Sequence, residues 1–220
     1  LQGSYDVEVG EVNVAGDVTE IGNSGSFEND GVDTGTEPLP DPYADLEPPE
    51  IDYPADCEAI QNDNGYISHT SGTSSILCSD IIESSSALEF EAGTYYLYGA
   101  DIRFNGTTFL ADDVTFVLTG DDSVGYGQLT VVGSGSVTLS APTDEGADYP
   151  GISIFQDRNA PYSTNDPNKL SGNSDIVLNG VAYFPNQHLY FGGSNQTQVP
   201  SCSMIIASTI EIHGTPNMDT

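Results

Sequence analysis

Two adjacent aspartate pairs are the residues whose type and spacing best suit chemistry: Asp112-Asp113 and Asp121-Asp122. Their carboxylates are hard oxygen ligands for Ca²⁺, and paired carboxylates about 6.5–9.5 Å apart perform inverting glycoside hydrolysis. Both pairs, however, stand beside glycine or where a strand begins, and aspartate supports turns at such places. Neither pair has the spacing of an EF-hand loop. We therefore predict turn residues, with a weak structural Ca²⁺ site at these four aspartates as the alternative.

Arg103 and the nearby Asp101 suggest a second chemistry, that of a polysaccharide lyase. A calcium-dependent lyase uses a basic side chain to abstract a proton beside a carboxylate. Its acidic substrate also needs a cationic cleft, but Lys and Arg number only 3 against 34 Asp and Glu, for a formal net charge of -31. We therefore predict that the protein is not an enzyme, with a polysaccharide-binding or polysaccharide-degrading protein as the alternative.

The histidines and the nucleophilic side chains form no catalytic pattern. His69, His188 and His213 are far apart and occur in neither an HxH nor an HxxxH motif, so we predict ordinary surface or turn residues. The sequence contains no GxSxG motif, and Cys78 has no neighbours that would activate its thiol. We predict no catalytic residue and no bound cofactor.

Tyrosines gather in two places along the chain. Tyr95, Tyr96 and Tyr98 share one predicted strand, and Tyr190 belongs to a second aromatic group. Tyrosine suits surfaces that bind proteins or glycans, because its ring is apolar and its hydroxyl is polar. We favour packing inside the protein for these side chains and keep a binding surface as the alternative.

The net charge limits the partners. Phosphate binding requires many Lys or Arg side chains, so a charge of -31 excludes a nucleic-acid partner. The same charge disfavours an anionic membrane surface, and no apolar run approaches the roughly 20 residues that span a bilayer. Such acidity suits a salty or calcium-rich medium, where ions shorten the reach of repulsion to about 10 Å or less. We expect a protein partner, with a glycan as the alternative.

The elements that position these residues divide the chain into three parts. Residues 1–22 alternate apolar and polar side chains and predict a half-buried pair of strands. Residues 23–56 are acidic and rich in Pro and Gly, so they predict an extended connector laid on a surface. Its apolar anchors to the body would be Leu39, Tyr43, Leu46 and Ile51. Residues 57–220 form the main domain.

The main domain consists of short segments rich in Val, Ile, Phe, Tyr and Thr, separated by Gly, Asn and Asp. Short strands with abrupt corners turn a chain from one face of a solenoid to the next. We therefore predict an all-β, right-handed parallel β-helix. A β-sandwich or jelly roll is the alternative, because the repeat is irregular. The predicted inward side chains are Leu88, Phe90, Ile102, Phe104, Val114, Phe116, Leu118, Leu129, Val131, Val137, Leu139, Ile152, Ile154, Ile176, Leu178, Val181, Tyr183, Leu189, Phe191, Ile206, Ile210 and Ile212.

Three cysteines, in a chain with abundant Ser, Thr, Asn and Gly, favour an oxidising, extracellular compartment. Cys57 and Cys78 both lie where the main domain begins, so we predict that they form a disulfide and leave Cys202 as the odd thiol. The sequence begins with Leu1 rather than Met, and we expect it to be a mature or excised part of a longer precursor.

Several segments occur in an order that resembles one protein family. They are DPYADLEPP, FEAGTYYL, VTFVLTG, SVTLSAPTDE, YPGISIFQDRNAP, LSGNSDIVLNGVAYFPNQHLYFGG and SCSMIIASTIEIHG. This ordered set resembles the C-terminal β-helical region of TadG-like proteins of tight-adherence (Flp) pilus systems. The resemblance implies a bacterial cell-surface protein, membrane-anchored in a longer precursor, that contacts a pilus component or a sister subunit. We therefore predict a non-enzymatic structural or adhesive role.

Overall fold

All regular structure in the described residues is β-strand, which confirms the predicted all-β class. The structure is a computed structural model that describes residues 6–8, 12–17, 26–28, 32–38, 40–84, 86–133, 135–172, 176–193, 196–198, 203–214 and 217–219. Within these ranges no helix occurs. The strands are short because Gly, Asn and Asp interrupt the runs of β-branched and aromatic residues.

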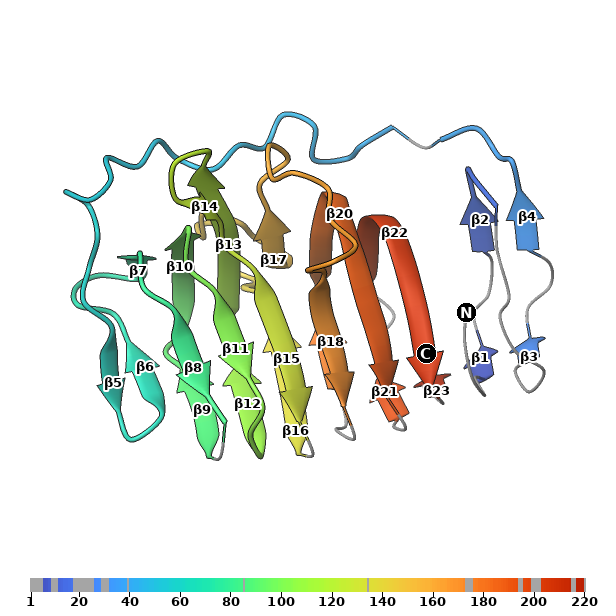
Figure 1. Ribbon diagram of the computed structural model, residues 1–220. Helices are drawn as coiled ribbons and strands as arrows, with labels where there is room; N and C mark the ends of the chain where they lie inside the picture. The colour runs from blue at the N-terminus through green and yellow to red at the C-terminus, as the bar shows by residue number, and fades with distance from the viewer. Residues whose placement is uncertain are drawn as a thin grey trace.

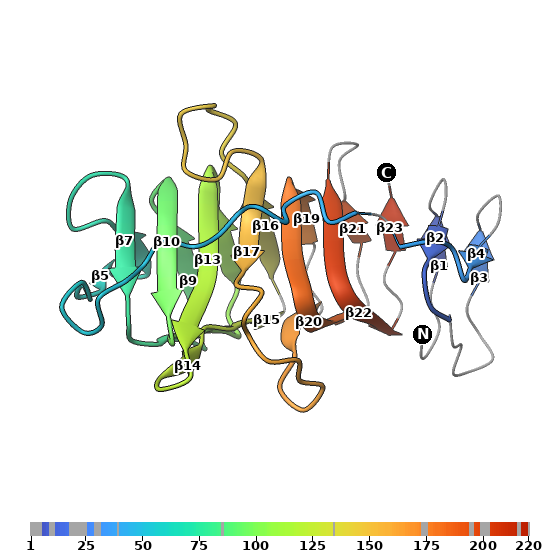
Figure 2. The same ribbon diagram turned by 90° about the horizontal axis from the view of Figure 1, so that it is seen from above.

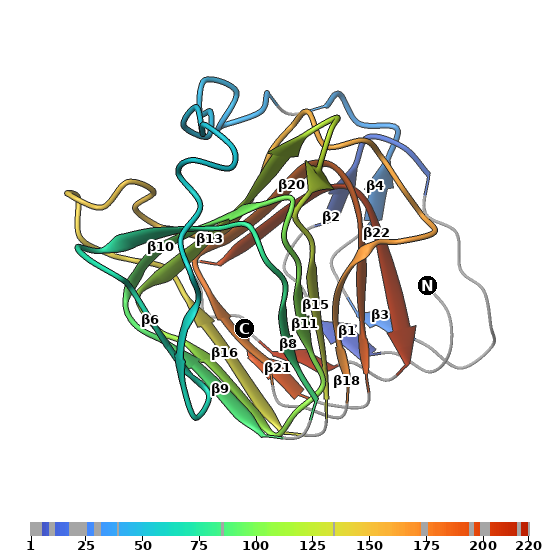
Figure 3. The same ribbon diagram turned by 60° about the vertical axis from the view of Figure 1, so that its left-hand side comes forward.

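Nine parallel strands form one sheet that curls around the core (Figure 3). In sheet order they are β7 (Ser74–Leu77), β10 (Gly93–Tyr98), β13 (Val114–Asp121), β17 (Ile152–Gln156), β20 (Val181–Gly193), β18 (Asn168–Gly172), β15 (Leu129–Gly133), β11 (Ile102–Phe104) and β8 (Ile81–Glu83). Outside this path, β22 (Met204–Gly214) pairs with β20, and β14 (Gly125–Tyr126) pairs with β13. The first residues of β20 pair with β17 and its last residues with β18, so the sheet curls at β20.

A ten-stranded sheet forms a further side of the core (Figure 3). Its order is β3 (Ser26–Glu28), β1 (Asp6–Glu8), β23 (Asn217–Asp219), β21 (Gln196–Gln198), β19 (Ile176–Asn179), β16 (Ser136–Ser140), β12 (Thr108–Ala111), β9 (Ala87–Phe90), β6 (Tyr66–Ser68) and β5 (Gln61–Asp63). β2 (Val12–Val14) and β4 (Val32–Thr34) pair with each other.

In the first part of the body, each strand pairs with the strand three elements later. β7 pairs with β10, β8 with β11, and β9 with β12. Among the described strands, only β5–β6 and β13–β14 pair in antiparallel fashion. The predicted alternative of a sandwich or jelly roll does not fit this pairing, since those folds are built from antiparallel sheets.

The main core is enclosed by these two sheets and is aromatic at its centre. The ring centroid of Phe116 lies 4.8 Å from that of Phe90, 6.0 Å from Tyr95 and 6.1 Å from Phe109. Most of the predicted inward side chains are buried in this core: Leu88, Phe90, Ile102, Phe104, Val114, Phe116, Leu118, Leu129, Val131, Val137, Leu139, Ile154, Ile176, Leu178, Leu189 and Phe191.

Four predicted inward side chains lie instead at a second apolar cluster, on the outer side of the curled sheet: Ile152, Val181, Tyr183 and Ile206. In the first part of β20, the residues that enter the main core are Ala182 and Phe184, not Val181 and Tyr183. The prediction was wrong here because these strands are apolar on both faces. Without alternating polar residues, the sequence does not reveal which face is inward.

The proline-rich connector covers this second cluster. It crosses the outer faces of β20, β17, β13 and β10 (Figure 2), and Tyr43, Leu46 and Ile51 pack against the cluster. The Tyr43 ring meets the Tyr183 ring edge-on at 5.3 Å, and the Tyr183 hydroxyl donates a hydrogen bond of 2.6 Å to Asp41. Tyr43, Leu46 and Ile51 therefore anchor the connector as predicted, whereas Leu39 lies outside the described residues.

Arg158 holds the connector by its backbone and by charge. Its guanidinium donates hydrogen bonds to the carbonyls of Tyr43 (2.7 Å) and Leu46 (3.2 Å), and it forms ion pairs with Asp41 (3.4 Å) and Glu47 (3.3 Å). Burial acts to raise the pKa of Asp41. The hydrogen bonds that Asp41 accepts and the charge of Arg158 outweigh this and lower that pKa below the ordinary value of 3.8.

Arg158→Ala should release the connector from the body. The substitution removes two charge-assisted hydrogen bonds to the connector backbone, so we expect a loss of about 1.5–3 kcal/mol in the free energy of unfolding. Limited proteolysis should cut between residues 40 and 56 faster than in the parent protein. Arg103→Ala is the matched control, because Arg103 also pairs with two carboxylates but its side chain is 52% exposed. Equal proteolysis of the two variants would show that Arg158 does not anchor the connector.

The N-terminal strands lie at the end of the molecule opposite to the start of the main domain (Figure 1). β1 pairs in parallel with β23, with Asp6 opposite Asn217, and β3 pairs with β1. Strands β3 and β4 fall within the stretch 23–56 that was expected to be an extended connector. From β4 the connector returns along the whole body towards β5 (Figure 1).

Candidate functional site

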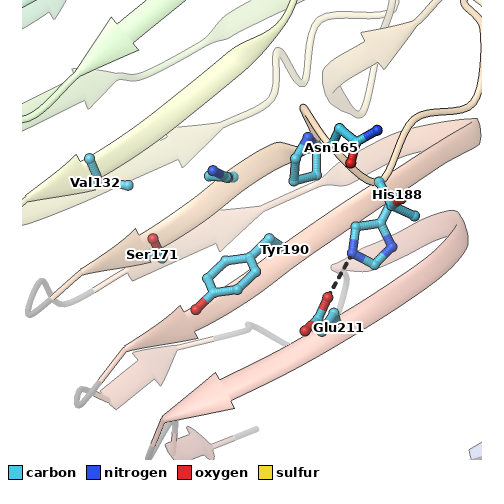
Figure 4. Close-up of a pocket in the computed structure, with 9 residues that line it drawn as sticks. Val132, Asn165, Ser171, His188, Tyr190 and Glu211 are labelled. Carbon is cyan, nitrogen blue, oxygen red and sulfur yellow. Dashed lines mark hydrogen bonds and ion pairs between the residues drawn. The ribbon is translucent and has the colours of Figure 1, made fainter. Parts of the chain in front are cut away.

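A pocket of about 450 Å³ opens on the outward face of β15, β18, β20 and β22 (Figure 4). A loop that follows β17 forms one side of it. Its lining residues are Val132, Thr164, Asn165, Pro167, Lys169, Ser171, His188, Tyr190 and Glu211. The pocket therefore combines an aromatic ring, both signs of charge, an amide and several hydroxyl groups.

Sheet register aligns the polar side chains of the pocket. Thr130 of β15 lies opposite Lys169, Lys169 opposite Tyr190, and Tyr190 opposite Glu211. Leu170, Leu189 and Phe191, which are adjacent to Lys169 and Tyr190 in the sequence, are buried in the main core. Because successive side chains of a strand point to opposite faces of the sheet, Lys169 and Tyr190 point outward. Register and alternation thus place Lys169, Tyr190 and Glu211 side by side in the pocket, on β18, β20 and β22. On β15 the row continues to Thr130, although that strand lines the pocket with Val132.

His188 is held between two side chains of β22. Its Nε2 lies 3.1 Å from Glu211 Oε2 (Figure 4). Its Nδ1 lies 2.7 Å from Thr209 Oγ1. The Thr209 hydroxyl also contacts the Tyr162 hydroxyl, at 3.0 Å. The residue His188 is only 7% exposed, so this network fixes one wall of the pocket.

The loop beside the pocket is tied down on both sides. Gln187 donates hydrogen bonds from Nε2 to the carbonyls of Ala160 (2.8 Å) and Pro161 (3.0 Å). On the other side, Gln128 Nε2 donates to the carbonyl of Asp166 at 3.1 Å. The pocket is therefore built before any ligand binds.

The order hydroxyl, histidine, carboxylate at Thr209, His188 and Glu211 is also that of a hydrolase triad. In such a triad the hydroxyl is directed at the substrate by the histidine. Here the Thr209 hydroxyl is shared with Tyr162, which ties the loop to the sheet. We therefore interpret these contacts as the support of a binding pocket.

Burial, followed by the charge of Glu211, raises the pKa of Tyr190, so its hydroxyl stays protonated at neutral pH.

Asp112 and Asp113 lie in a bend before β13, and Asp121 and Asp122 lie where β13 ends in a turn. Asp121 accepts hydrogen bonds from the Ser123 hydroxyl (2.6 Å), the Tyr98 hydroxyl (2.7 Å) and the Ser123 backbone (2.7 Å), and these lower its pKa. Asp113 adopts a left-handed backbone conformation with φ of 54°, which aspartate tolerates. Among the described residues, no group of three or more His, Cys, Asp or Glu side chains could hold a metal ion. Asp112, Asp113, Asp121 and Asp122 therefore belong to no such group.

Three of the four candidate interaction aromatics, Tyr95, Tyr96 and Tyr98, are buried. Tyr95 is fully buried and donates a hydrogen bond of 3.0 Å to the Glu91 carbonyl. Tyr96 and Tyr98 are 8% and 9% exposed, and the Tyr98 ring stacks on Tyr53 of the connector. All three side chains therefore pack inside the protein: Tyr95 lies in the main core, whereas Tyr96 and Tyr98 lie on the outer face of β10, which the connector covers.

The predicted disulfide joins Cys57 to Cys78, with a Cα–Cα distance of 5.6 Å. Beside it, Glu58 forms a parallel bridge with Leu77 and accepts a hydrogen bond from the Ile76 backbone at 3.3 Å. These contacts cover the outer edge of β7. Cys202 lies outside the described residues.

The sequence prediction missed most of the pocket. Tyr190 was a candidate, but Lys169, His188 and Glu211 were not, and His188 was expected to be a surface or turn residue. His69 is also engaged, with its ring stacked on Tyr95 at 4.4 Å, while the His213 side chain lies outside what the structure describes. The available signal was polar residues alternating with apolar ones in KLSG, HLYF and TIEI, which marks an outward face.

Comparisons of the chain with protein families, with curated proteins and with solved structures find no match. Among the described residues, no helix has the length and apolar character needed to cross a bilayer.

Proposed function

We propose that this chain is a structural or adhesive cell-surface protein that associates with its own kind, and that its main domain is a right-handed parallel β-helix. Parallel pairing of β7, β8 and β9 with the next three strands supports one such coil stacked on another. Right-handed crossovers are the general rule for parallel strands. The disulfide fits an oxidising, extracellular environment. The TadG-like resemblance adds a pilus component as a second protein partner.

The proposal rests on an apolar side chain of β22, Ile210, that is exposed where its neighbours in the sheet are buried in the core. Ile210 lies opposite Leu189 in the sheet, and Leu189 is fully buried in the main core. Ile210 was predicted to be inward, yet it is 45% exposed, because no described strand covers this part of β22. Exposed apolar area at a sheet edge favours the addition of another chain.

The two ends of the body differ. At the β7 end, the disulfide, Glu58 and the β5–β6 hairpin cover the first strands. At the other end, β23 already pairs in parallel with β1, so its edge accepts strands from a distant part of the chain. β2 and β4 lie beyond β22 at this end (Figure 1), but among the described strands β22 pairs only with β20. A second copy that covers this unpaired edge of β22 would bury Ile210 in the same manner. Association therefore proceeds from the β22 end.

Ile210→Lys should abolish this association. The substitution places an ammonium group where the partner would bury an apolar side chain, although it makes the chain less acidic and reduces mutual repulsion. The parent protein should associate more strongly as salt or Ca²⁺ is added, because ions screen its charge of -31. Light scattering over a salt and calcium series measures both effects.

Thr138→Lys is the matched control, because Thr138 lies on β16 within the ten-stranded sheet and is half-buried there. It makes the same change in side chain away from the open end and should associate like the parent. A parent protein that stays monomeric at every salt and calcium concentration would reject the self-association, and so would equal association of the parent and Ile210→Lys.

A further inference from the structure

We propose that the pocket between β15, β18, β20 and β22 binds a neutral glycan chain. The inference rests on the pocket alone and does not depend on the self-association proposed above. It assigns a ligand class to the outward face of the curled sheet, whereas self-association uses the end of that sheet.

The outward row that passes through the pocket extends beyond it. Register continues from Thr130 to Arg103 of β11, and from Arg103 to Ile82 of β8. Neighbouring strands are about 4.8 Å apart, so the stretch from Lys169 to Glu211 spans about 10 Å and the whole row more than about 20 Å. A row of this shape suits an extended polymer lying across the strands.

The side chains of the pocket match a polyhydroxylated ligand. Tyr190 supplies a partly buried ring against which the apolar face of a sugar can pack. Asn165 and Ser171 carry groups that both donate and accept hydrogen bonds, and Lys169 donates them. A few polar groups beside an aromatic surface are the usual composition of a small-molecule pocket.

The charges select a neutral ligand. A polyanion is repelled by the net charge of -31, and Glu211 places one carboxylate directly in the wall. A polycation is attracted at long range, but Lys169 stands in the same row as Glu211 and repels it at contact. A neutral glycan meets neither obstacle and can use both groups as hydrogen-bond partners.

The pocket is rigid enough to bind without large ordering costs. His188 is held by Thr209 and Glu211, and the loop is held by Gln187 and Gln128. Affinity rises when a site is ordered before binding, because less side-chain and loop entropy is lost.

Calorimetric titration of the full chain with hexasaccharides tests the proposal. The probes are the neutral hexamers of cellulose, xylan, mannan and chitin, with hexagalacturonate and hexalysine as charged probes. We expect at least one neutral hexamer to bind with a Kd between about 1 µM and 1 mM, and both charged probes to bind at least tenfold more weakly. The proposal would be overturned if no neutral hexamer bound, or if a charged probe bound more tightly than every neutral hexamer.

Substitutions locate the binding. Tyr190→Ala should weaken the Kd for that neutral hexamer about tenfold, whereas Tyr66→Ala, at a tyrosine 41% exposed on β6, should leave it unchanged. Equal urea midpoints for parent and variants establish that Tyr190→Ala is folded. Amide shifts on glycan addition at Lys169, Tyr190 and Glu211 provide a readout that needs no variant. Unchanged affinity in Tyr190→Ala, or shifts confined to other residues, would refute this site. A parent protein that stays monomeric at every salt and calcium concentration would reject the self-association but leave this result intact, so the two proposals can fail separately.

Discussion

Phe116→Ala is expected to lower the free energy of unfolding by about 3–5 kcal/mol. The Phe116 side chain on β13 is fully buried, and its ring contacts the rings of Phe90, Tyr95 and Phe109. Removing the ring deletes buried apolar surface and leaves a cavity. Because β13 is paired with β10 and β17 on either side, the backbone has little freedom to collapse into that cavity. Urea unfolding, with the slope compared between parent and variant, measures the change.

Ile82→Ala is the control for the core substitution. Ile82 also lies on a strand of the curled sheet, but it is 64% exposed and should change the free energy of unfolding by no more than about 0.5 kcal/mol. A loss below about 1 kcal/mol in Phe116→Ala would mean that the aromatic centre does not carry the stability of the body.

Period-two alternation predicted the inward side chains correctly where one face of a strand is solvated. In β9 the residues Leu88 and Phe90 are buried, while Ala87 and Glu89 are exposed. In β17 all five residues are buried, because the connector covers the outer face. Alternation carries no information there, and the sequence of one strand does not show that a segment 100 residues earlier will cover it.

For the connector, the local sequence predicted its conformation and its apolar anchors, but not the part of the body that it contacts. Its prolines predicted an extended segment, and its isolated Tyr43, Leu46 and Ile51 predicted contact with the body. The segment of the body that receives them was not predictable from local pattern. Arg158 was known only as one of three cations, although it makes the principal polar contacts of the connector.

The pocket escaped prediction because uneven spacing hides its row. His188 and Thr209, which are hydrogen-bonded to each other, are 21 residues apart in the sequence. Leu129 and Asn168, which are hydrogen-bonded between the paired strands β15 and β18, are 39 residues apart. Loops of unequal length therefore separate side chains that the sheet brings into register. A search for motifs at short spacing finds none of these pairs, whereas a search for polar residues at alternate positions in every strand would have found the outward face.

Replacing both Cys57 and Cys78 by Ser should lower the free energy of unfolding by about 3 kcal/mol, as expected when a loop of 21 residues is no longer closed in the unfolded chain. The double substitution should also destabilise the folded state locally, at the outer edge of β7. The disulfide holds Glu58 beside β7, where its backbone donates a hydrogen bond of 2.7 Å to the Ile76 carbonyl. Without the disulfide this bridge competes with solvent, so the outer edge of β7 becomes open to hydrogen exchange and to pairing with another chain.

Two measurements separate these consequences. Urea unfolding of the double variant, and of the parent protein with a reducing agent, should show the same loss, because both lack the same covalent link. Amide exchange should speed up at Ile76 and Leu77 while Phe116 and Val117, deep in the sheet, remain protected. Cys202→Ser is the matched control, since it removes a cysteine outside the Cys57–Cys78 disulfide and should leave both measurements unchanged. If the double variant kept the parental stability, the loop from Cys57 to Cys78 would already be ordered in the unfolded chain, and the link would serve only to protect the β7 edge.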